Sequence, residues 1–293
     1  MNLNEMQHCT MEKRQILLTS GPIGTMILGR LRRDHADASP RDAMRVSVET
    51  PEIYADIARE YADAGADIIF AATLAANGLY PWLHSLEEVR RANNRAVAVV
   101  RSVAPGRKVA SMVSSPTLDD MSRHTAEMLI EQFCSLADAG ADMHFLETLV
   151  AEDAARMLTE CALEADVRCG TQTPLHISLT PVTGLRLLGG IPLDAAACSL
   201  LQYSPASIGI NCLYPPAGIA AVVRCLAKVS SSLPLSVRPA ASVPGKRVVP
   251  PAEFAQCIAD CLAVDAVAIV GSCCGATPEH TSHLKTLLTE SNP

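Results

Sequence analysis

Short apolar runs alternate with longer amphipathic segments along almost the whole chain, and this alternation repeats eight times. The apolar runs have the length and turn-bounded character of buried strands, and each is followed by a segment with helical periodicity. The strands are predicted at 15–20, 66–72, 108–113, 141–147, 175–180, 207–212, 233–239 and 266–272. The helices are predicted at 52–64, 85–103, 122–139, 151–165, 192–203, 216–230, 251–262 and 278–289.

Eight strand–helix units predict an α/β fold, a single (β/α)8 TIM barrel. Twice the chain repeats one device, a helix followed by ADAGAD and a strand, with Gly65 and Gly140 just past the helix ends. A doubly wound sheet is the competing architecture, but GPIGT at 21–25 does not match its Gly-rich first turn. No composition break suggests a linker, so we expect one domain over 1–293, with 1–14 as a loose N-terminal extension.

Charge and composition exclude several classes of partner. The net charge of −7 and the pI of about 5.6 argue against a nucleic-acid surface, and only 3% of the residues are aromatic. We see no secretory signal and no apolar stretch near the ~20 residues that cross a bilayer, so no membrane partner is expected. The eleven cysteines are therefore expected to be thiols in a reducing, cytoplasmic setting.

The chemistry of such a barrel lies where its strands end. Three cysteines stand at the ends of the sixth and eighth predicted strands: Cys212, Cys273 and Cys274. Three thiolates that converge there would form a zinc site with one coordination position open, which is the arrangement of a catalytic site. The alternative is that all three are small apolar core residues, as free cysteines commonly are.

The same segments carry a family resemblance. GINC at 209–212 and GSCCG at 271–275 resemble the two cysteine motifs of the homocysteine S-methyltransferase family, which includes betaine–homocysteine methyltransferase and the homocysteine module of cobalamin-dependent methionine synthase. GPIGTMI, PEIYADIAREYADAGADII, GADMHFLET and TPEH follow in the expected order, so the resemblance covers nearly the whole chain. It implies a (β/α)8 barrel, in agreement with the strand count.

The resemblance also implies roles for individual residues. Cys212, Cys273 and Cys274 would hold Zn²⁺, and Glu147 would bind the ammonium group of homocysteine. The alternative for Glu147 is a structural pair with a neighbouring loop arginine, because buried acids need partners. The loop GPIGT would hold the carboxylate of the amino acid through its backbone N–H groups. The expected substrate-binding set is completed by Gly24, Thr25, Thr73 and Asn211.

Several positions depart from the family pattern. Ser20 stands where the family usually has an acidic residue, and Pro22 replaces a glycine. After the second strand, Ala72 and Leu74 replace an amide and an aromatic side chain. Ala240 replaces the asparagine of a Pro-Asn pair and follows Arg238 and Pro239. These changes leave the cysteines intact but weaken the expected recognition of an ammonium group. Arg238 and the Lys246-Arg247 pair are candidates to meet an anionic donor or acceptor.

The predicted function is zinc-dependent transfer of a methyl group from an activated donor to the thiolate of homocysteine, giving methionine. One alternative keeps this chemistry with a different small thiol acceptor, and another is a non-catalytic binding or regulatory barrel. The candidate donors are S-methylmethionine, S-adenosylmethionine, a betaine or another sulfonium compound, and a corrinoid partner protein. The sequence leaves the donor, the pathway and the oligomeric state open.

Overall fold

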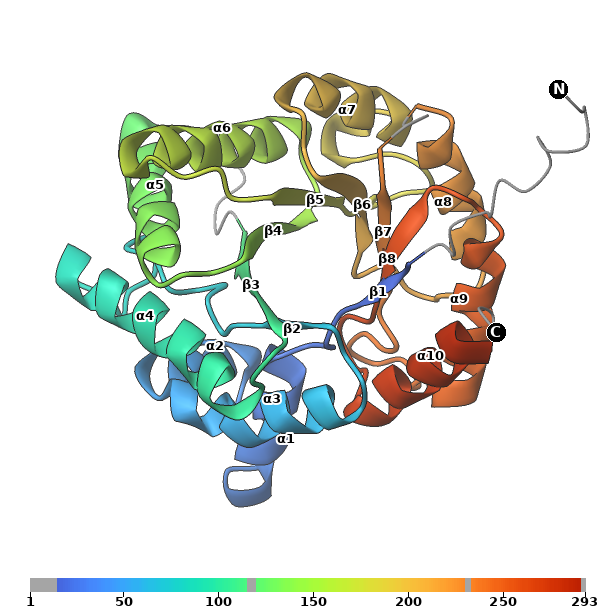
Figure 1. Cartoon of the computed structure of the whole chain (residues 1–293), viewed down its shortest axis with the longest axis horizontal. Helices are drawn as coiled ribbons and strands as arrows, with labels where there is room; N and C mark the ends of the chain where they lie inside the picture. The colour runs from blue at the N-terminus through green and yellow to red at the C-terminus, as the bar shows by residue number, and fades with distance from the viewer. Residues whose placement is uncertain (1–14, 115–119, 230–232, 291–293) are drawn as a thin grey trace, which may run out of the picture.

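Parallel strands form an eight-stranded sheet that curls around a central axis (Figure 1). The computed structural model describes residues 15–114, 120–229 and 233–290, so the expected N-terminal extension lies outside the described residues. The strand order is β1-β8-β7-β6-β5-β4-β3-β2. The strands are β1 (Leu17–Leu18), β2 (Ile68–Phe70), β3 (Lys108–Val113), β4 (Met143–Leu149), β5 (Leu175–Leu179), β6 (Ser207–Asn211), β7 (Leu235–Arg238) and β8 (Val267–Val270).

The first and second strands bring the two edges of this sheet together. The backbone N–H of Ser20 donates to the carbonyl of Ile68 at 2.7 Å, and the N–H of Asp67 donates to that of Leu18 at 2.7 Å. Thr19 and Ile68 form a parallel bridge at the same point. The predicted (β/α)8 barrel is thereby confirmed, and all eight predicted strands are present at or inside their expected ranges, except β4, which runs two residues further.

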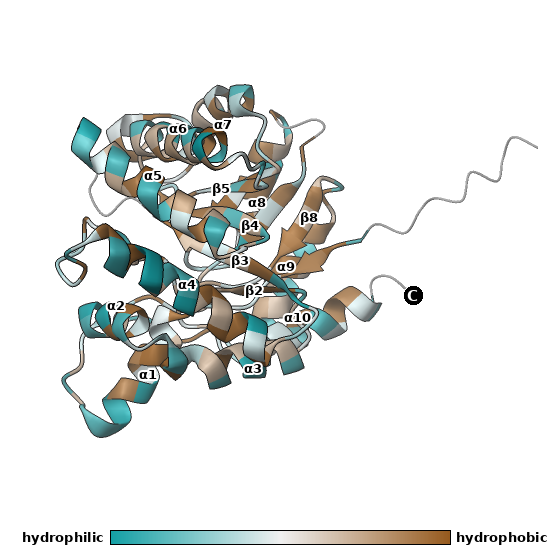
Figure 2. Cartoon of the chain, turned by 60° about the vertical axis from the view of Figure 1, so that its left-hand side comes forward, coloured by the Kyte–Doolittle hydropathy of each residue, from teal (hydrophilic) through white to brown (hydrophobic). Residues whose placement is uncertain are grey.

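Helices surround the barrel, and each predicted helix is found (Figure 1). They are α3 (Ala55–Asp63), α4 (Leu86–Val103), α5 (Arg123–Asp138), α6 (Glu152–Cys169), α7 (Leu193–Leu200), α8 (Ile219–Ala227), α9 (Pro251–Leu262) and α10 (Pro278–Glu290). Short 3-10 helices are η1 (Pro51–Tyr54), η2 (Leu188–Gly190) and η3 (Leu201–Tyr203). The surrounding helices carry hydrophilic residues on their outward faces, while the strands are hydrophobic (Figure 2). This pattern is expected when a parallel sheet is buried on both faces.

Two helices that the sequence reading did not predict lie between β1 and η1. They are α1 (Gly24–Asp34) and α2 (Pro40–Glu49). The second begins with a capping box, because Ser39 Oγ accepts the N–H of Asp42 and the Asp42 side chain accepts the N–H of Ser39. Pro40 occupies the first helical position, where its missing N–H costs nothing. The predicted helices began only at residue 52, so the prediction for 21–51 was incomplete.

Aromatic side chains fill the barrel interior below the strand ends. Phe70 of β2 meets Phe145 of β4 edge-on at a ring-centroid distance of 5.1 Å, and His176 of β5 stacks on Phe145 at 4.4 Å. All three side chains are buried. This layer supports the residues directly above it, at the carboxyl ends of the strands.

Candidate metal centre and acceptor site

Backbone hydrogen bonds carry the three cysteines to a common point beyond β6, β7 and β8. The N–H of Cys212 donates to the carbonyl of Arg238 at 3.1 Å, which continues the pairing of β6 with β7. The N–H of Cys273 donates to the carbonyl of Pro239 at 2.8 Å, which continues the pairing of β7 with β8. The segment after β7 thus lies between the two cysteine motifs and holds them in register.

The turn after the adjacent cysteines depends on Gly275. Its φ is +80°, a conformation that L side chains adopt only under strain. A Cβ at this position would lie 2.7 Å from the backbone nitrogen of Ser242, whose N–H donates to the carbonyl of Cys274 at 3.0 Å. The close approach of these two segments fixes the course of the chain immediately after Cys274.

The three sulfur atoms converge. All lie within 4.8 Å of one another, and Cys212 Sγ and Cys274 Sγ are 3.5 Å apart. A tetrahedral zinc ion with Zn–S bonds of about 2.3 Å separates its sulfur ligands by about 3.8 Å, so the observed spacing fits such an ion. Among residues 15–114, 120–229 and 233–290, this is the one cluster of three or more histidine, cysteine, aspartate or glutamate side chains close enough to share a metal.

The close approach of the three thiols does not make them more acidic. Hydrogen bonding to Cys212, together with burial, raises the pKa of the Cys273 thiol above its usual range. The pKa of the Cys274 thiol is also raised, to about 12. Without a cation the cluster is therefore protonated at neutral pH, and a metal that binds there must displace protons.

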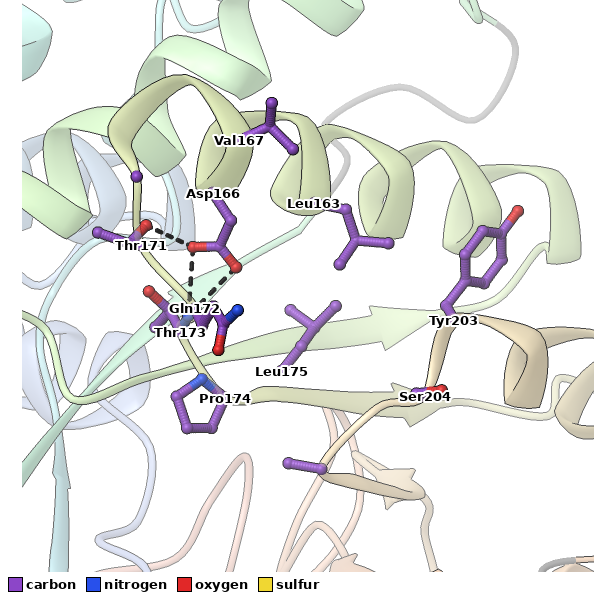
Figure 3. Close-up of a pocket in the computed structure, with 12 residues that line it drawn as sticks. Leu163, Asp166, Val167, Thr171, Gln172, Thr173, Pro174, Leu175, Tyr203 and Ser204 are labelled. Carbon is purple, nitrogen blue, oxygen red and sulfur yellow. Dashed lines mark hydrogen bonds between the residues drawn. The ribbon is translucent and has the colours of Figure 1, made fainter.

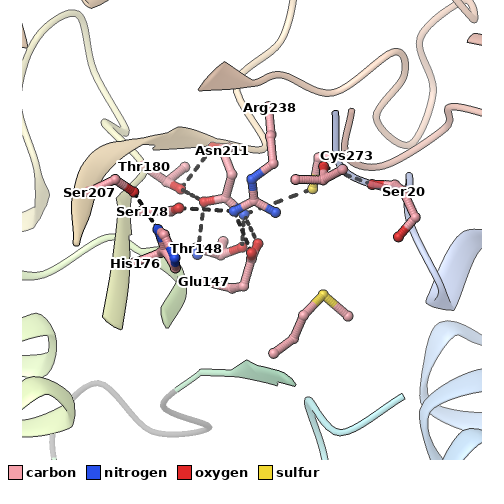
Figure 4. A network of polar contacts seen from close by, with 12 residues as sticks. Ser20, Glu147, Thr148, His176, Ser178, Thr180, Ser207, Asn211, Arg238 and Cys273 are labelled. Carbon is pink, nitrogen blue, oxygen red and sulfur yellow. Dashed lines mark hydrogen bonds and ion pairs between the residues drawn. The ribbon is translucent and has the colours of Figure 1, made fainter. Parts of the chain in front are cut away.

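Glu147, near the end of β4, lies beside this cluster but is not free. Its carboxylate forms an ion pair with the guanidinium of Arg238, and its other oxygen accepts a hydrogen bond from Asn211 Nδ2 at 2.5 Å (Figure 4). Asn211 Nδ2 also lies 3.9 Å from Cys273 Sγ, which links the carboxylate to the cysteine cluster. The sequence reading offered a loop arginine as a structural partner for Glu147, and the partner found is the last residue of β7.

Arg238 is buried in the centre of the barrel, with 1% of its surface exposed. Its Nη2 donates to Ser178 Oγ of β5 at 2.9 Å. The guanidinium carbon lies 4.7 Å from the centre of the Phe145 ring and 5.0 Å from that of Phe70, a distance at which cations and aromatic faces attract. Arg238 thus already has an anionic partner inside the protein, the carboxylate of Glu147, and its expected contact with an anionic donor or acceptor stays a prediction.

The loop GPIGT leads into the N-terminus of α1. Gly24 is the first residue of the helix, and no side chain caps the helix end. The first hydrogen bond into the helix is from Ile27 N–H to the carbonyl of Ile23, so the preceding N–H groups have no intrahelical acceptor. Thr25 Oγ1 is buried and has no hydrogen-bond partner within the described part of the chain. These donors can bind an anion, as helix N-termini do.

The side chains of Thr73 and Asn211 form hydrogen bonds with other residues of the protein. Thr73 Oγ1 donates to the carbonyl of Met112 at 2.8 Å and accepts its N–H at 2.9 Å, which ties the loop after β2 to β3. Asn211 Oδ1 accepts the N–H of Thr148 at 2.9 Å and the hydroxyl of Thr180 at 3.1 Å. Their expected contacts with the acceptor stay predictions.

Two neighbours of Glu147 were absent from the expected set. Thr148 has a φ of +56°, and its hydroxyl accepts a hydrogen bond from Asn211 Nδ2 at 3.0 Å. Ser178 holds Arg238. A periodicity argument assigns Thr148 to the outer face of β4, because it follows the inward-facing Glu147. Its left-handed backbone breaks that alternation, and the sequence carries no signal of the break.

A separate hollow lies at the opposite end of the barrel. It is lined by residues of α6, the connection to β5, η3 and the chain after it, among them Leu163, Asp166 and Tyr203 (Figure 3). The carboxylate of Asp166 accepts hydrogen bonds from the hydroxyl of Thr171 at 2.5 Å and from the N–H of Thr173 at 3.1 Å. These contacts close the helix-to-strand connection, so this carboxylate has a structural role.

A (β/α)8 barrel with a three-thiol cluster at the carboxyl ends of β6 and β8 is the architecture of an enzyme that handles a sulfur or metal centre at its mouth. The chain matches the sequence profile of the family described as Homocysteine S-methyltransferase over residues 17–288. It therefore belongs to the homocysteine S-methyltransferase family. The predicted family and the predicted enzyme class, a methyltransferase, are both confirmed.

Two curated relatives are methionine synthases. The protein of Mycobacterium leprae (strain TN) is 27% identical over 252 residues, and that of Mycobacterium tuberculosis (strain ATCC 25618 / H37Rv) is 28% identical over 253 residues. Each match covers 78% of this chain and 21% of the relative, so the chain spans about a fifth of the length of these relatives.

Solved structures of the homocysteine methyltransferase MmuM from Escherichia coli have the same fold. The metallated form has a TM-score of 0.75 at 23% identity, covering 94% of this chain and 96% of that one. The apo form has a TM-score of 0.71 at 24% identity, with 96% and 98% covered. Within the described residues of our chain, no helix is both long and apolar enough to cross a membrane.

Proposed function

We infer that this chain transfers a methyl group from an activated donor to the thiol of homocysteine or of a small acceptor of similar length, giving a methyl thioether. The observation that carries this function is the convergence of three sulfurs at the carboxyl ends of β6 and β8, in a chain of the homocysteine S-methyltransferase family. For homocysteine itself the product would be methionine.

Cys212, Cys273 and Cys274 would hold Zn²⁺, because their spacing fits tetrahedral zinc and soft thiolates favour this ion. When bound, Zn²⁺ would supply a Lewis acid that keeps an acceptor thiol deprotonated at neutral pH. Three protein ligands leave one position for that acceptor. The side chain of Asn211, near Cys273 and hydrogen-bonded to Glu147, fixes the polar groups that border the cluster.

The remaining groups orient the acceptor. The free N–H groups at the start of α1 and the unpartnered Thr25 hydroxyl supply donors for its carboxylate. The acceptor sulfur then attacks the methyl carbon and forms the new carbon–sulfur bond. The bond from methyl to the donor breaks, and its electron pair leaves with the donor. The thiol proton, lost before the attack, goes to solvent.

The donor must carry a methyl group on a good leaving atom. Sulfonium compounds such as S-methylmethionine or S-adenosylmethionine, a betaine, and a corrinoid protein as a partner all meet this requirement. A cytoplasmic location, consistent with the ten free cysteines of the described residues, and one domain over the chain are further parts of the proposal.

Metal analysis combined with a donor–acceptor screen tests this function. We expect one zinc per chain and donor-dependent formation of the methyl thioether. Cys273→Ser should lose both, since a hydroxyl is a poor zinc ligand. Cys198→Ser, which changes an exposed cysteine away from the cluster, should keep both. Methyl transfer by a metal-free Cys273→Ser chain would refute the proposed mechanism.

A further inference from the structure

The interior of the barrel holds one opposed pair of charges. Among the described residues, Glu147 and Arg238 are the buried acidic and basic side chains, with 4% and 1% of their surfaces exposed. Both lie in the network of polar contacts that also holds Asn211 and Cys273 (Figure 4). The two charges cancel, so the floor of the acceptor site carries no net charge.

Glu147 is engaged on both oxygens. One forms the ion pair with Arg238, and the other accepts the 2.5 Å hydrogen bond from Asn211. An acceptor ammonium group would have to displace one of these partners. Losing one partner of a buried charge is costly, because the group that is left behind stays buried without compensation.

Contacts from three strands hold Arg238 in place. Its guanidinium is packed against Phe70 and Phe145 and bonded to Ser178, three groups that come from three different strands. An ammonium group placed against Glu147 would therefore lie beside a fixed cation. Like charges in a poorly solvated site repel, so this arrangement disfavours an ammonium ligand.

The neighbouring polar groups of the mouth are neutral. Ser20 is buried, and its Oγ accepts the N–H of Phe70 at 3.0 Å. As a hydroxyl it carries no negative charge. Ser272 Oγ and Thr25 Oγ1 are buried hydroxyls with no hydrogen-bond partner in the described chain. Ser272 Oγ packs against Gly21 of the first loop. Hydroxyl and backbone N–H donors of this kind suit a carboxylate.

We propose that Arg238 determines the acceptor, and that the site prefers a small mercaptocarboxylate without an α-ammonium group over homocysteine. This inference rests on the proposed function and names its acceptor class. Its consequence is that Glu147 serves as the counter-ion of Arg238 instead of anchoring an amino group. Arg238 acts as a specificity-determining residue by occupying that carboxylate.

Homocysteine and 4-mercaptobutanoate form a matched pair for the test, because they differ only in the α-ammonium group. Each is titrated calorimetrically into the zinc-loaded full chain without a methyl donor, so that the result does not depend on finding the donor. We expect 4-mercaptobutanoate to bind at least about tenfold more tightly. Tighter binding of homocysteine would overturn the inference and leave the proposed function standing. Binding of neither thiol would overturn both.

Variants separate specificity from folding. Arg238→Met frees Glu147 and should shift the preference toward homocysteine by at least about tenfold. Arg168→Met removes an exposed arginine of α6 paired with Glu127 and should change neither affinity. Melting curves identify any variant that fails to fold, and the comparison of the two thiols on the unsubstituted chain decides the matter if Arg238→Met does so.

Discussion

Two residues beside the cysteine cluster adopt a left-handed backbone that side chains normally avoid. Thr148 has a φ of +56° and Cys212 a φ of +57°. Each conformation costs on the order of 1 kcal/mol and persists only where its surroundings enforce it. Here the N–H of Thr148 donates to Asn211 Oδ1, and the N–H of Cys212 donates to the carbonyl of Arg238. The strain is thus held by the residues that build the site.

Asn211 is the residue on which this local structure depends. Asn211→Ala would leave the carboxylate of Glu147, the N–H of Thr148 and the hydroxyl of Thr180 without one partner each. We expect the free energy of unfolding to fall by about 3 kcal/mol, measured by urea denaturation. Asn94→Ala, on the exposed face of α4, should change it by less than about 0.5 kcal/mol. Equal effects of the two substitutions would contradict this account of Asn211.

The positions of the cysteines can be predicted from the sequence, but the ion pair between Glu147 and Arg238 cannot. Strand ends can be read from apolar runs, so the positions of Cys212, Cys273 and Glu147 at the mouth are predictable. The direction in which Arg238 extends is not, because a long side chain at a strand end can point to solvent or into the barrel. Its capture by Glu147, Ser178 and two aromatic rings is a tertiary result.

At the scale of the elements, the strands carry buried histidines whose titration affects stability. His144 of β4 bonds to Ser111 Oγ of β3, and His176 of β5 bonds to Ser207 Oγ of β6, both at 2.7 Å. Burial lowers the pKa of each imidazole to about 4, from an ordinary value of 6.5. Protonation therefore favours the unfolded chain, in which both histidines titrate normally.

Stability should be fully present above pH 6.5 and decline as the pH falls toward 4. Each histidine contributes on the order of 1 kcal/mol per pH unit within that window. Urea denaturation of the chelator-treated chain at several pH values measures the slope. His144→Gln should make the slope shallower, while His84→Gln, at an exposed position, should leave it unchanged. A slope that is the same in the native chain and in His144→Gln would contradict the assignment.

The elements that sequence reasoning missed were α1 and α2, for an identifiable reason. The eight-fold alternation already accounted for one helix after each strand, and 21–51 carried no second apolar run to separate the extra pair. The capping signal of α2, Ser39 with Asp42 three residues later, was present in the sequence. Such signals mark where a helix begins, but the count of strand–helix units gave no reason to search there.

In the molecule as a whole, the residues that stabilise the barrel are distinct from the cysteines of the metal site. The apolar core fills the barrel and the space between the strands and the surrounding helices, whereas the cysteines lie beyond the ends of β6 and β8. The regular repeat made this architecture predictable, since parallel strands separated by helices have few alternatives. We therefore expect the barrel to fold without metal.

Removing the metal should lower thermal stability without unfolding the chain. A ligand that binds only the folded state stabilises it by about 4 kcal/mol when its free concentration is a thousandfold above its Kd. Chelator treatment should leave the far-UV circular dichroism spectrum unchanged and lower Tm, and added zinc should restore Tm. Loss of the helical spectrum on chelation would contradict a metal-independent barrel.

X-ray absorption at the zinc edge counts the sulfur atoms around the ion and so shows whether three cysteines hold it. The zinc-loaded chain should show three sulfurs at about 2.3 Å and one lighter atom, and saturation with an acceptor thiol should raise the count to four. A shell dominated by oxygen or nitrogen, or a sulfur count that does not change when the thiol is added, would contradict a three-cysteine centre with one position open for the acceptor.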